Sequence, residues 1–180
     1  MAATPEEVKA ALADAERIHS AAAVDEALDR MADDLTRHYR DRDPVLVCVM
    51  TGGLIPAGHL LTRLEFPLQL DYVHATRYQG STEGGDLEWM AGPNLPLEGR
   101  DVILVDDILD GGWTLATIKD GLLQRGAASV ASVVLVSKRV PREVDIEADY
   151  VGLEVEDRYV FGFGMDYEEY HRNLRGIYAL

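Results

Sequence analysis

The chain has 180 residues and 47% hydrophobic residues, enough for one domain with a buried core, which excludes a disordered polymer. Its formal net charge of −15 is a poor match for nucleic-acid phosphates, so we expect no nucleic-acid partner. The apolar runs are too short to cross a bilayer, and the lone Cys48 in one of them suggests a reducing compartment. We therefore expect a cytoplasmic protein that binds no membrane.

The first forty residues are predicted to form two helices, over Pro5–Glu16 and Ala21–Arg40, because both segments are rich in Ala, Leu, Glu and Arg. Residues 17–19 between them are expected to be a short extended piece. Ser20 is a suitable N-cap for the second helix. One face of that helix is apolar through Val24, Leu28, Met31 and Leu35.

Strands and helices alternate from residue 44 onward. Val45–Met50 is apolar on both faces, which is typical of a central parallel strand. A helix is expected over Leu54–Leu64 and a strand over Phe66–Ala75. The polar segment Thr76–Asn94 has no periodicity and is predicted to be a long loop, of a length that is often functional.

The second half of the chain repeats this alternation. Strands are expected at Asp101–Val105, Ser129–Val136 and Tyr150–Val155, with a helix from about Thr114 to Gly126. The order predicts right-handed crossovers and an open parallel sheet, in which ligands bind at the carboxyl ends of the strands. We therefore expect the chemistry just after three strand ends: Met50, Val105 and Val136.

Three carboxylates follow the buried strand that ends at Val105: Asp106, Asp107 and Asp110. Carboxylates this close repel each other unless a cation or hydroxyl donors compensate. Gly111-Gly112 then lets the backbone turn its amides inward at the start of a helix, which makes a cradle for a phosphate group. Acids beside such a cradle suit a sugar phosphate with Mg²⁺. An acidic loop with a glycine turn would give the same pattern.

The run from Val102 to Leu115 resembles the phosphoribosyl-pyrophosphate (PRPP) signature of type I phosphoribosyltransferases. Residues 136–141 and 157–167 resemble the purine-binding segments of hypoxanthine-guanine phosphoribosyltransferases, and the similarity covers roughly residues 15–180. The resemblance implies an α/β fold with an open, mostly parallel sheet flanked by helices. It also implies a small hood subdomain, built from the N-terminal segment and the C-terminal region.

On the same resemblance, residues 1–180 form a single phosphoribosyltransferase domain. Its core is expected at about 40–140, and its hood at about 15–22 and 150–180.

The resemblance assigns residues to PRPP. Asp110 would be the general base, and Asp106 and Asp107 would meet the ribose hydroxyls and magnesium-bound waters. The 5-phosphate would lie on the amides from Asp110 through Gly111, Gly112, Trp113 and Thr114, with the Thr114 hydroxyl. The pyrophosphate would pair with Arg172 and lie on the loop of Thr51, Gly52 and Gly53, where relatives carry a cis peptide bond that does not involve proline.

The resemblance also assigns residues to a purine with a 6-oxo group. Lys138 would donate a hydrogen bond to that oxygen, which adenine lacks. Tyr159 would stack on the ring, and the Val160 backbone would contact the ring edge. Arg77 and Tyr78 would belong to a lid that closes over the site.

The implied cofactor is Mg²⁺. Asp166 would bind it directly, and Asp106 and Asp107 would contact it through water or ribose. Three positions depart from the usual pattern. Gly111 stands where many relatives have Thr or Ser, Thr51 replaces a lysine of some relatives, and Arg77 replaces a serine of the lid.

The resemblance thus implies a purine-salvage enzyme that makes inosine or guanosine monophosphate and pyrophosphate from PRPP and hypoxanthine or guanine. It also implies a homodimer or homotetramer. One alternative is a transferase that prefers xanthine, which shares the 6-oxo group. Another is a non-catalytic PRPP-sensing regulator of the same fold, which the acidic charge and the retained Asp110, Lys138 and Asp166 oppose.

Overall fold

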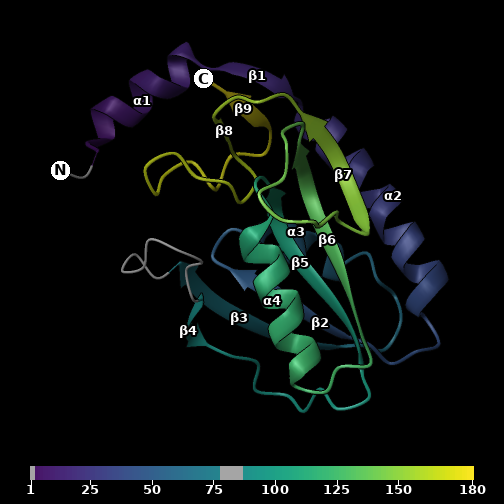
Figure 1. Cartoon of the computed structure of the whole chain (residues 1–180). Coiled ribbons are helices and arrows are strands. Elements are labelled where there is room, and N and C mark those ends of the chain that lie inside the picture. Colours follow the sequence, from purple (N-terminus) through teal and green to yellow (C-terminus); the bar gives the residue numbers. More distant parts are fainter. Residues whose placement is uncertain (1–2, 78–86) are drawn as a thin grey trace.

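A computed structural model of the chain describes residues 3–77 and 87–180, which centre on a six-stranded sheet of order β4-β3-β2-β5-β6-β7 (Figure 1). The parallel strands are β2 (Val45–Met50), β3 (Gln69–Arg77), β5 (Asp101–Leu109), β6 (Ser129–Lys138) and β7 (Tyr150–Val155). Strand β4 (Leu87–Ala91) runs antiparallel to β3 at the edge. The sheet therefore gathers the carboxyl ends of five parallel strands at one rim.

Helices cover both faces of this sheet. Helices α2 (Ala21–Tyr39) and α3 (Leu54–Leu61) pack on one face, and α4 (Trp113–Gln124) packs on the other. Each face of the sheet has its own hydrophobic core, and alternate residues of β2 pack into one or the other. Leu46 packs with α2 and α3, and Val47 packs with α4. This two-sided burial explains why the strand is apolar throughout.

The hood is a separate three-stranded antiparallel sheet of order β1-β9-β8. Its strands are β1 (Glu16–His19), β8 (Val160–Phe161) and β9 (Ile177–Ala179), so the two ends of the chain pair with each other (Figure 1). Phe161 is fully buried and stacks on His171 and Tyr178, with ring centroids 5.4 and 5.8 Å away. Helix α1 (Pro5–Asp14) precedes β1.

The predicted fold class, an open and mostly parallel sheet flanked by helices, is confirmed. The prediction of a loop over all of Thr76–Asn94 is wrong, because β3 extends to Arg77 and Leu87–Ala91 forms β4. Pairing with β3 supplies backbone hydrogen bonds that the polar composition did not reveal. Strand β7, which lies within the range of 150–180 expected for the hood, pairs with β6 in the main sheet.

Strand β5 does not end at Val105 as predicted but continues to Leu109. Its pairing with β2 stops at Val105, whereas its pairing with β6 continues through Ile108 and Leu109. The last residues of β5 therefore have a neighbouring strand on one side only, and their other side is open to other groups. Among the described residues, no helix combines the length and apolar composition that a membrane span requires.

Candidate active site

The loop after β2, the last residues of β5 and the loop after β8 meet in very close contact. A Cβ atom added at Gly52 would lie 2.0 Å from Oδ2 of Asp107, and one added at Gly164 would lie 2.3 Å from the Gly52 carbonyl oxygen. Gly164 also has a φ of +107°, which an L side chain rarely adopts. The peptide bond between Met50 and Thr51 is cis. Glycine is thus required where these three segments touch.

Asp106 and Asp107 lie side by side at this meeting point. Burial and the neighbouring Asp107 carboxylate raise the pKa of Asp106 well above its ordinary value. Burial also raises the pKa of Asp107, although Arg172 opposes this shift. Asp106 accepts a hydrogen bond from the Asp107 N–H, and Asp107 accepts one from the Ile108 N–H. The pair is therefore short of compensating charge, as expected of acids that await hydroxyl donors or a cation.

Arg172 connects the hood loop to this acid pair. Its guanidinium donates to the Gly164 carbonyl oxygen at 2.8 Å and forms an ion pair of 2.8 Å with Asp166. The second Asp166 oxygen accepts a hydrogen bond from the Glu169 N–H at 2.9 Å. The structure thus brings the predicted residues Arg172 and Asp166 together on the side of Asp107.

Asp110 and Lys138 form a second charged pair, at the ends of β5 and β6. Lys138 Nζ lies 2.8 Å from Asp110 Oδ2 and 3.9 Å from Asp157 Oδ1. The lysine side chain is only 12% exposed, whereas that of Asp110 is 55% exposed. The predicted base therefore faces open space, with the predicted 6-oxo donor directly beside it.

A cavity of about 440 Å³ opens between these acids and α4. It is lined by residues 106–115 and Glu143. Gly112 is the N-cap of α4 and has a φ of +90°, so the backbone N–H groups at the start of the helix line the cavity. This geometry matches the phosphate cradle that the sequence predicts, which we define as residues 110–114.

Tyr159 and Val160 lie in the hood, as predicted. The Tyr159 hydroxyl donates to the Asp166 carbonyl oxygen at 3.4 Å, and the residue is 52% exposed. Val160 is buried and pairs with Ala179 in the hood sheet. Among the described residues, no hydrogen bond or ion pair joins Tyr159 to Lys138. Lys138, on one side of the predicted purine site, thus belongs to the main sheet, and Val160, on the other side, belongs to the hood sheet.

Comparisons with known proteins show the family to which the chain belongs. Residues 14–169 match the model of the phosphoribosyl transferase domain. The chain is 37% identical to a hypoxanthine-guanine phosphoribosyltransferase of Streptococcus thermophilus, over 80% of this chain and 81% of that protein. The chain belongs to the hypoxanthine-guanine phosphoribosyltransferase family. A hypoxanthine-guanine-xanthine phosphoribosyltransferase of Tritrichomonas foetus is 34% identical over 84% of this chain and 83% of its own length.

Solved structures of phosphoribosyltransferases agree with this family assignment. The hypoxanthine phosphoribosyltransferase of Staphylococcus aureus superposes with a TM-score of 0.89 at 30% identity, covering 95% of this chain and 94% of that one. The sequence-based recognition of this phosphoribosyltransferase family is thereby confirmed, together with its fold.

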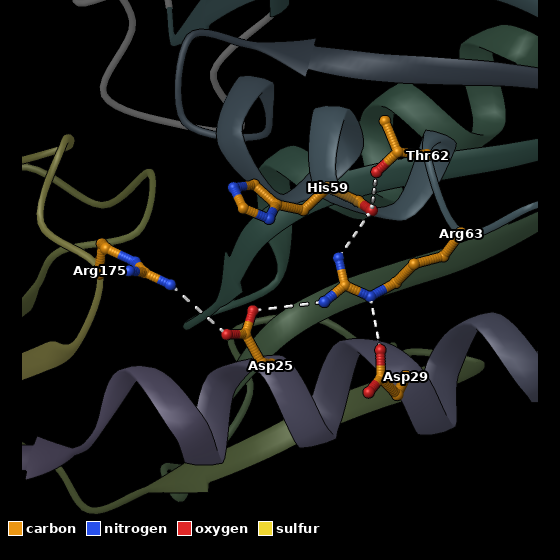
Figure 2. Close-up of polar contacts among 6 residues, drawn as sticks. All are labelled: Asp25, Asp29, His59, Thr62, Arg63 and Arg175. Carbon is orange, nitrogen blue, oxygen red and sulfur yellow. Dashed lines mark hydrogen bonds and ion pairs between the residues drawn. The ribbon is translucent and has the colours of Figure 1, made fainter.

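In this phosphoribosyltransferase, an ion-pair network joins the C-terminal end of α3 to α2 (Figure 2). Arg63, just after the helix, donates to the His59 carbonyl oxygen at 3.0 Å. The same guanidinium contacts Asp29 at 2.6 Å and Asp25 at 3.3 Å, both on α2. Arg175 from the hood side lies 3.7 Å from Asp25. The network thus holds the C-terminal end of α3, and Gly53 is the N-cap residue at the other end.

Two further residues, Arg142 and Glu143, lie at the site and were not predicted from the sequence. Glu143 lines the phosphate cavity, and a Cβ atom at Gly111 would lie 2.7 Å from its carboxyl group. A side chain at position 111 would therefore have to displace the flexible Glu143 side chain. Arg142 contacts the backbone of both Asp110 and Lys138. The basic residues after Lys138 were the available signal.

The predicted lid falls largely outside the described residues. Arg77 ends β3 and pairs with Leu87 in β4, so its backbone is placed at the sheet edge. Tyr78 lies outside the described residues.

Proposed function

We propose that this protein is a purine-salvage enzyme that transfers the 5-phosphoribosyl group from PRPP to hypoxanthine or guanine and releases pyrophosphate. The observation that carries the proposal is the pair of Lys138 and Asp110, 2.8 Å apart beside the cavity at the start of α4. In this proposal, the Asp110 carboxylate accepts a proton and the Lys138 ammonium donates a hydrogen bond to an oxo group, at the point where a bound base meets the sugar.

In the proposed reaction, Asp110 is the general base. It accepts a proton from the purine as a ring nitrogen bonds to the anomeric carbon and the bond to pyrophosphate breaks. Lys138 neutralises Asp110 in the free enzyme, and it turns to the 6-oxo oxygen when the purine arrives. A donor at this position disfavours adenine, because it would face the 6-amino group without an acceptor.

The phosphoribosyl part is proposed to lie along the loop after β5. The ribose hydroxyls donate to Asp106 and Asp107, which supplies the compensation that this buried pair lacks. The 5-phosphate accepts hydrogen bonds from the cradle amides of Gly111, Gly112, Trp113 and Thr114 and from the Thr114 hydroxyl. The pyrophosphate lies on Thr51, Gly52 and Gly53 and pairs with Arg172.

The donor set also fits Mg²⁺, which prefers oxygen ligands and shares them with phosphates. Within residues 3–77 and 87–180, no three His, Cys, Asp or Glu side chains converge on a metal site of their own. An ion that the substrate also binds needs fewer protein ligands. Asp166 is the proposed direct ligand, and Asp106 and Asp107 would contact the ion through water or ribose. The bound ion would neutralise charge on the leaving pyrophosphate. Asp166 keeps free lone pairs beside its contact with Arg172.

The purine is proposed to stack on Tyr159, whose exposed ring can cover a base, with the Val160 backbone at the ring edge. Arg77 and Tyr78 are proposed to form the lid. Its closure would exclude water from a transition state with oxocarbenium character.

We further propose a homodimer or homotetramer in the cytoplasm. Leu54, Leu70 and Tyr72 are large apolar side chains exposed near one another around a cavity that Met50 and Leu61 also line. A second copy of the chain would cover them. Analytical ultracentrifugation of the wild type and of Leu70→Asp tests this, because the substitution should shift the protein toward monomer.

The function is tested by supplying hypoxanthine, guanine, xanthine or adenine separately, with PRPP and Mg²⁺, and measuring nucleotide formation. We expect turnover with hypoxanthine or guanine that a chelator abolishes, and little with adenine. A clear preference for xanthine would favour the first alternative. If no base reacted while PRPP still bound, the regulator would become the better explanation.

A further inference from the structure

Arg142, in the connection from β6 to β7, contacts two parts of the site with one side chain. Its Nη1 donates to the backbone carbonyl oxygens of Asp110 at 2.9 Å and Lys138 at 2.8 Å. Its Nη2 donates to the Ser137 hydroxyl at 2.8 Å and lies 3.5 Å from the Glu147 carboxylate. Only 13% of the side chain is exposed. The guanidinium therefore links the loop after β5 to the end of β6.

The two ends of this link differ in how firmly they are already held. Ser137 and Lys138 belong to β6, which pairs with β7 at both positions. Asp110 follows the last residue of β5 and lies in no strand or helix. Arg142 is thus anchored on the rigid sheet, and the part that it restrains is the Asp110 loop.

Holding the Asp110 carbonyl fixes more than one atom. That carbonyl and the Gly111 N–H belong to one planar peptide unit, and in a trans peptide they point in opposite directions. The next unit is restrained in the same way, because the Glu143 N–H donates to the Gly111 carbonyl oxygen at 2.8 Å. This bond sets the direction of the Gly112 N–H. Residues 142 and 143 therefore orient two successive amides of the phosphate cradle.

We propose that Arg142 is a positioning residue that presets the phosphate cradle, with the Glu143 main chain as its second support. The inference rests on the proposed function, in which this cradle receives the 5-phosphate of PRPP. Amides that already point at the anion need no reordering when it binds, which strengthens binding. The effect falls on the phosphoribosyl part of the substrate and not on the purine.

The contact pattern explains why the residue is arginine. Nη1 donates to two carbonyl oxygens and Nη2 donates to a hydroxyl. This arrangement needs the two nitrogens that a planar guanidinium group holds at a fixed spacing. The Nε atom is buried and has no partner among the residues that the structure describes, so the two Nη groups carry the whole interaction. A lysine keeps the charge, but its single nitrogen cannot occupy both Nη positions, so it loses either the pair of carbonyl contacts or the Nη2 contacts with Ser137 and Glu147.

The test compares Arg142→Lys and Arg142→Met with a matched control, Arg139→Met. Arg139 is in the same connection, but its side chain is 60% exposed and its ion pairs, with Glu154 and Glu156, lie away from the cradle. The probe is ribose 5-phosphate, which presents the 5-phosphate without purine or pyrophosphate. Calorimetry gives its Kd, steady-state kinetics give the KM for PRPP and for guanine, and thermal unfolding gives Tm.

We expect Arg142→Lys to weaken ribose 5-phosphate binding about tenfold, in line with the loss of a charge-assisted hydrogen bond. The KM for PRPP should rise in parallel, while the KM for guanine stays within about twofold and Arg139→Met matches the wild type. Wild-type affinity for ribose 5-phosphate in Arg142→Lys would overturn the proposal. So would an equal loss for PRPP and guanine together with a lower Tm, since that marks a general structural role.

Two further arms keep the test decisive. If Arg142→Met does not fold, Arg142→Lys still tests the guanidinium. Ser137→Ala removes the hydroxyl partner of Nη2 but keeps both carbonyl contacts, so it should weaken ribose 5-phosphate binding less than Arg142→Lys does. If the wild type transfers no phosphoribosyl group, the proposed function fails. The ribose 5-phosphate comparison needs no turnover and judges the role of Arg142 separately.

Discussion

The two halves of the candidate site are built in different ways. The half proposed for PRPP follows the long buried strands β2 and β5, which place Gly52, Asp106 and Asp107. The hood half rests on strands of four, two and three residues and on a loop with unusual backbone conformations. In that loop φ is positive at Gly162, Phe163, Gly164, Glu168, Glu169 and His171. The first half thus depends mainly on which side chains the strands carry, and the second depends mainly on the backbone conformation of its loop.

The largest effect that separates the halves should come from the proposed base. Asp110→Asn removes the proton acceptor at the PRPP half, so kcat should fall by about 10²–10⁴-fold while the Kd for PRPP stays within a few-fold. Tyr159→Leu in the hood should instead raise the KM for guanine up to about tenfold, with a small change in kcat. Stopped assays with titrated guanine and PRPP measure both. Undiminished turnover in Asp110→Asn would refute its role.

A pair of glycine substitutions tests the importance of backbone conformation. Gly164→Ala places a Cβ 2.3 Å from the Gly52 carbonyl oxygen at a φ of +107°, and neither backbone can move easily. We expect it to reduce the free energy of unfolding by about 2–3 kcal/mol. Gly52→Ala instead meets the Asp107 carboxylate, which can rotate, so it should impair PRPP binding more than stability. Urea titration and PRPP binding of both variants distinguish the two outcomes, and equal stability losses would contradict the contrast.

A smaller effect, on stability, is expected near the edge of the main sheet. There the buried Asp71 of β3 accepts hydrogen bonds from the backbone of residues 94–95, which follow β4. Burial alone would raise the pKa of Asp71, but hydrogen bonds from the N–H groups of Leu95, Tyr72 and Asn94 and from the Asn94 side chain outweigh it and lower the pKa. A lowered pKa means that the stabilisation is complete above the ordinary aspartate value of about 3.9 and is lost as pH falls through the folded-state pKa.

Asp71→Asn should therefore cost about 1–2 kcal/mol at pH 7, since an amide NH₂ would face the backbone donors. Thermal unfolding from pH 7 to pH 3 should show the gap between wild type and variant narrowing below about pH 4. A gap that stayed constant across this range would show that the Asp71 charge does not contribute.

The PRPP half could be predicted well from the sequence. Val45–Met50 and Asp101–Val105 are apolar on both faces because each serves two cores, and that pattern marks central strands directly. Acids and glycines after such a strand also fit an acidic loop with a glycine turn, so Asp106, Asp110 and Gly112 are assigned to a site through the family resemblance of residues 102–115. The structure places them at one rim of the sheet.

The remainder depends on contacts that are distant in sequence. Strand β4 lies in a polar segment, and only its pairing with β3 makes it a strand. Strands β8 and β9 are too short to show a period of two. In the sequence, Arg142 looks like an ordinary charged residue after a strand. Its hydrogen-bond partner, the Asp110 carbonyl oxygen, is 32 residues away along the chain. The roles of the individual site residues remain predictions.

The order of strands in the hood bears on how the enzyme is made. Its middle strand, β9, follows every strand of the main sheet, while its partner β1 precedes them all, so Glu16 pairs with Ala179 across nearly the whole chain. During translation the main sheet can assemble on the emerging polypeptide, whereas the hood must wait until residues 177–179 have left the ribosome. A nascent chain would thus form the proposed sugar-phosphate cradle and Lys138 before the hood residues Tyr159 and Val160, which are proposed to contact the base.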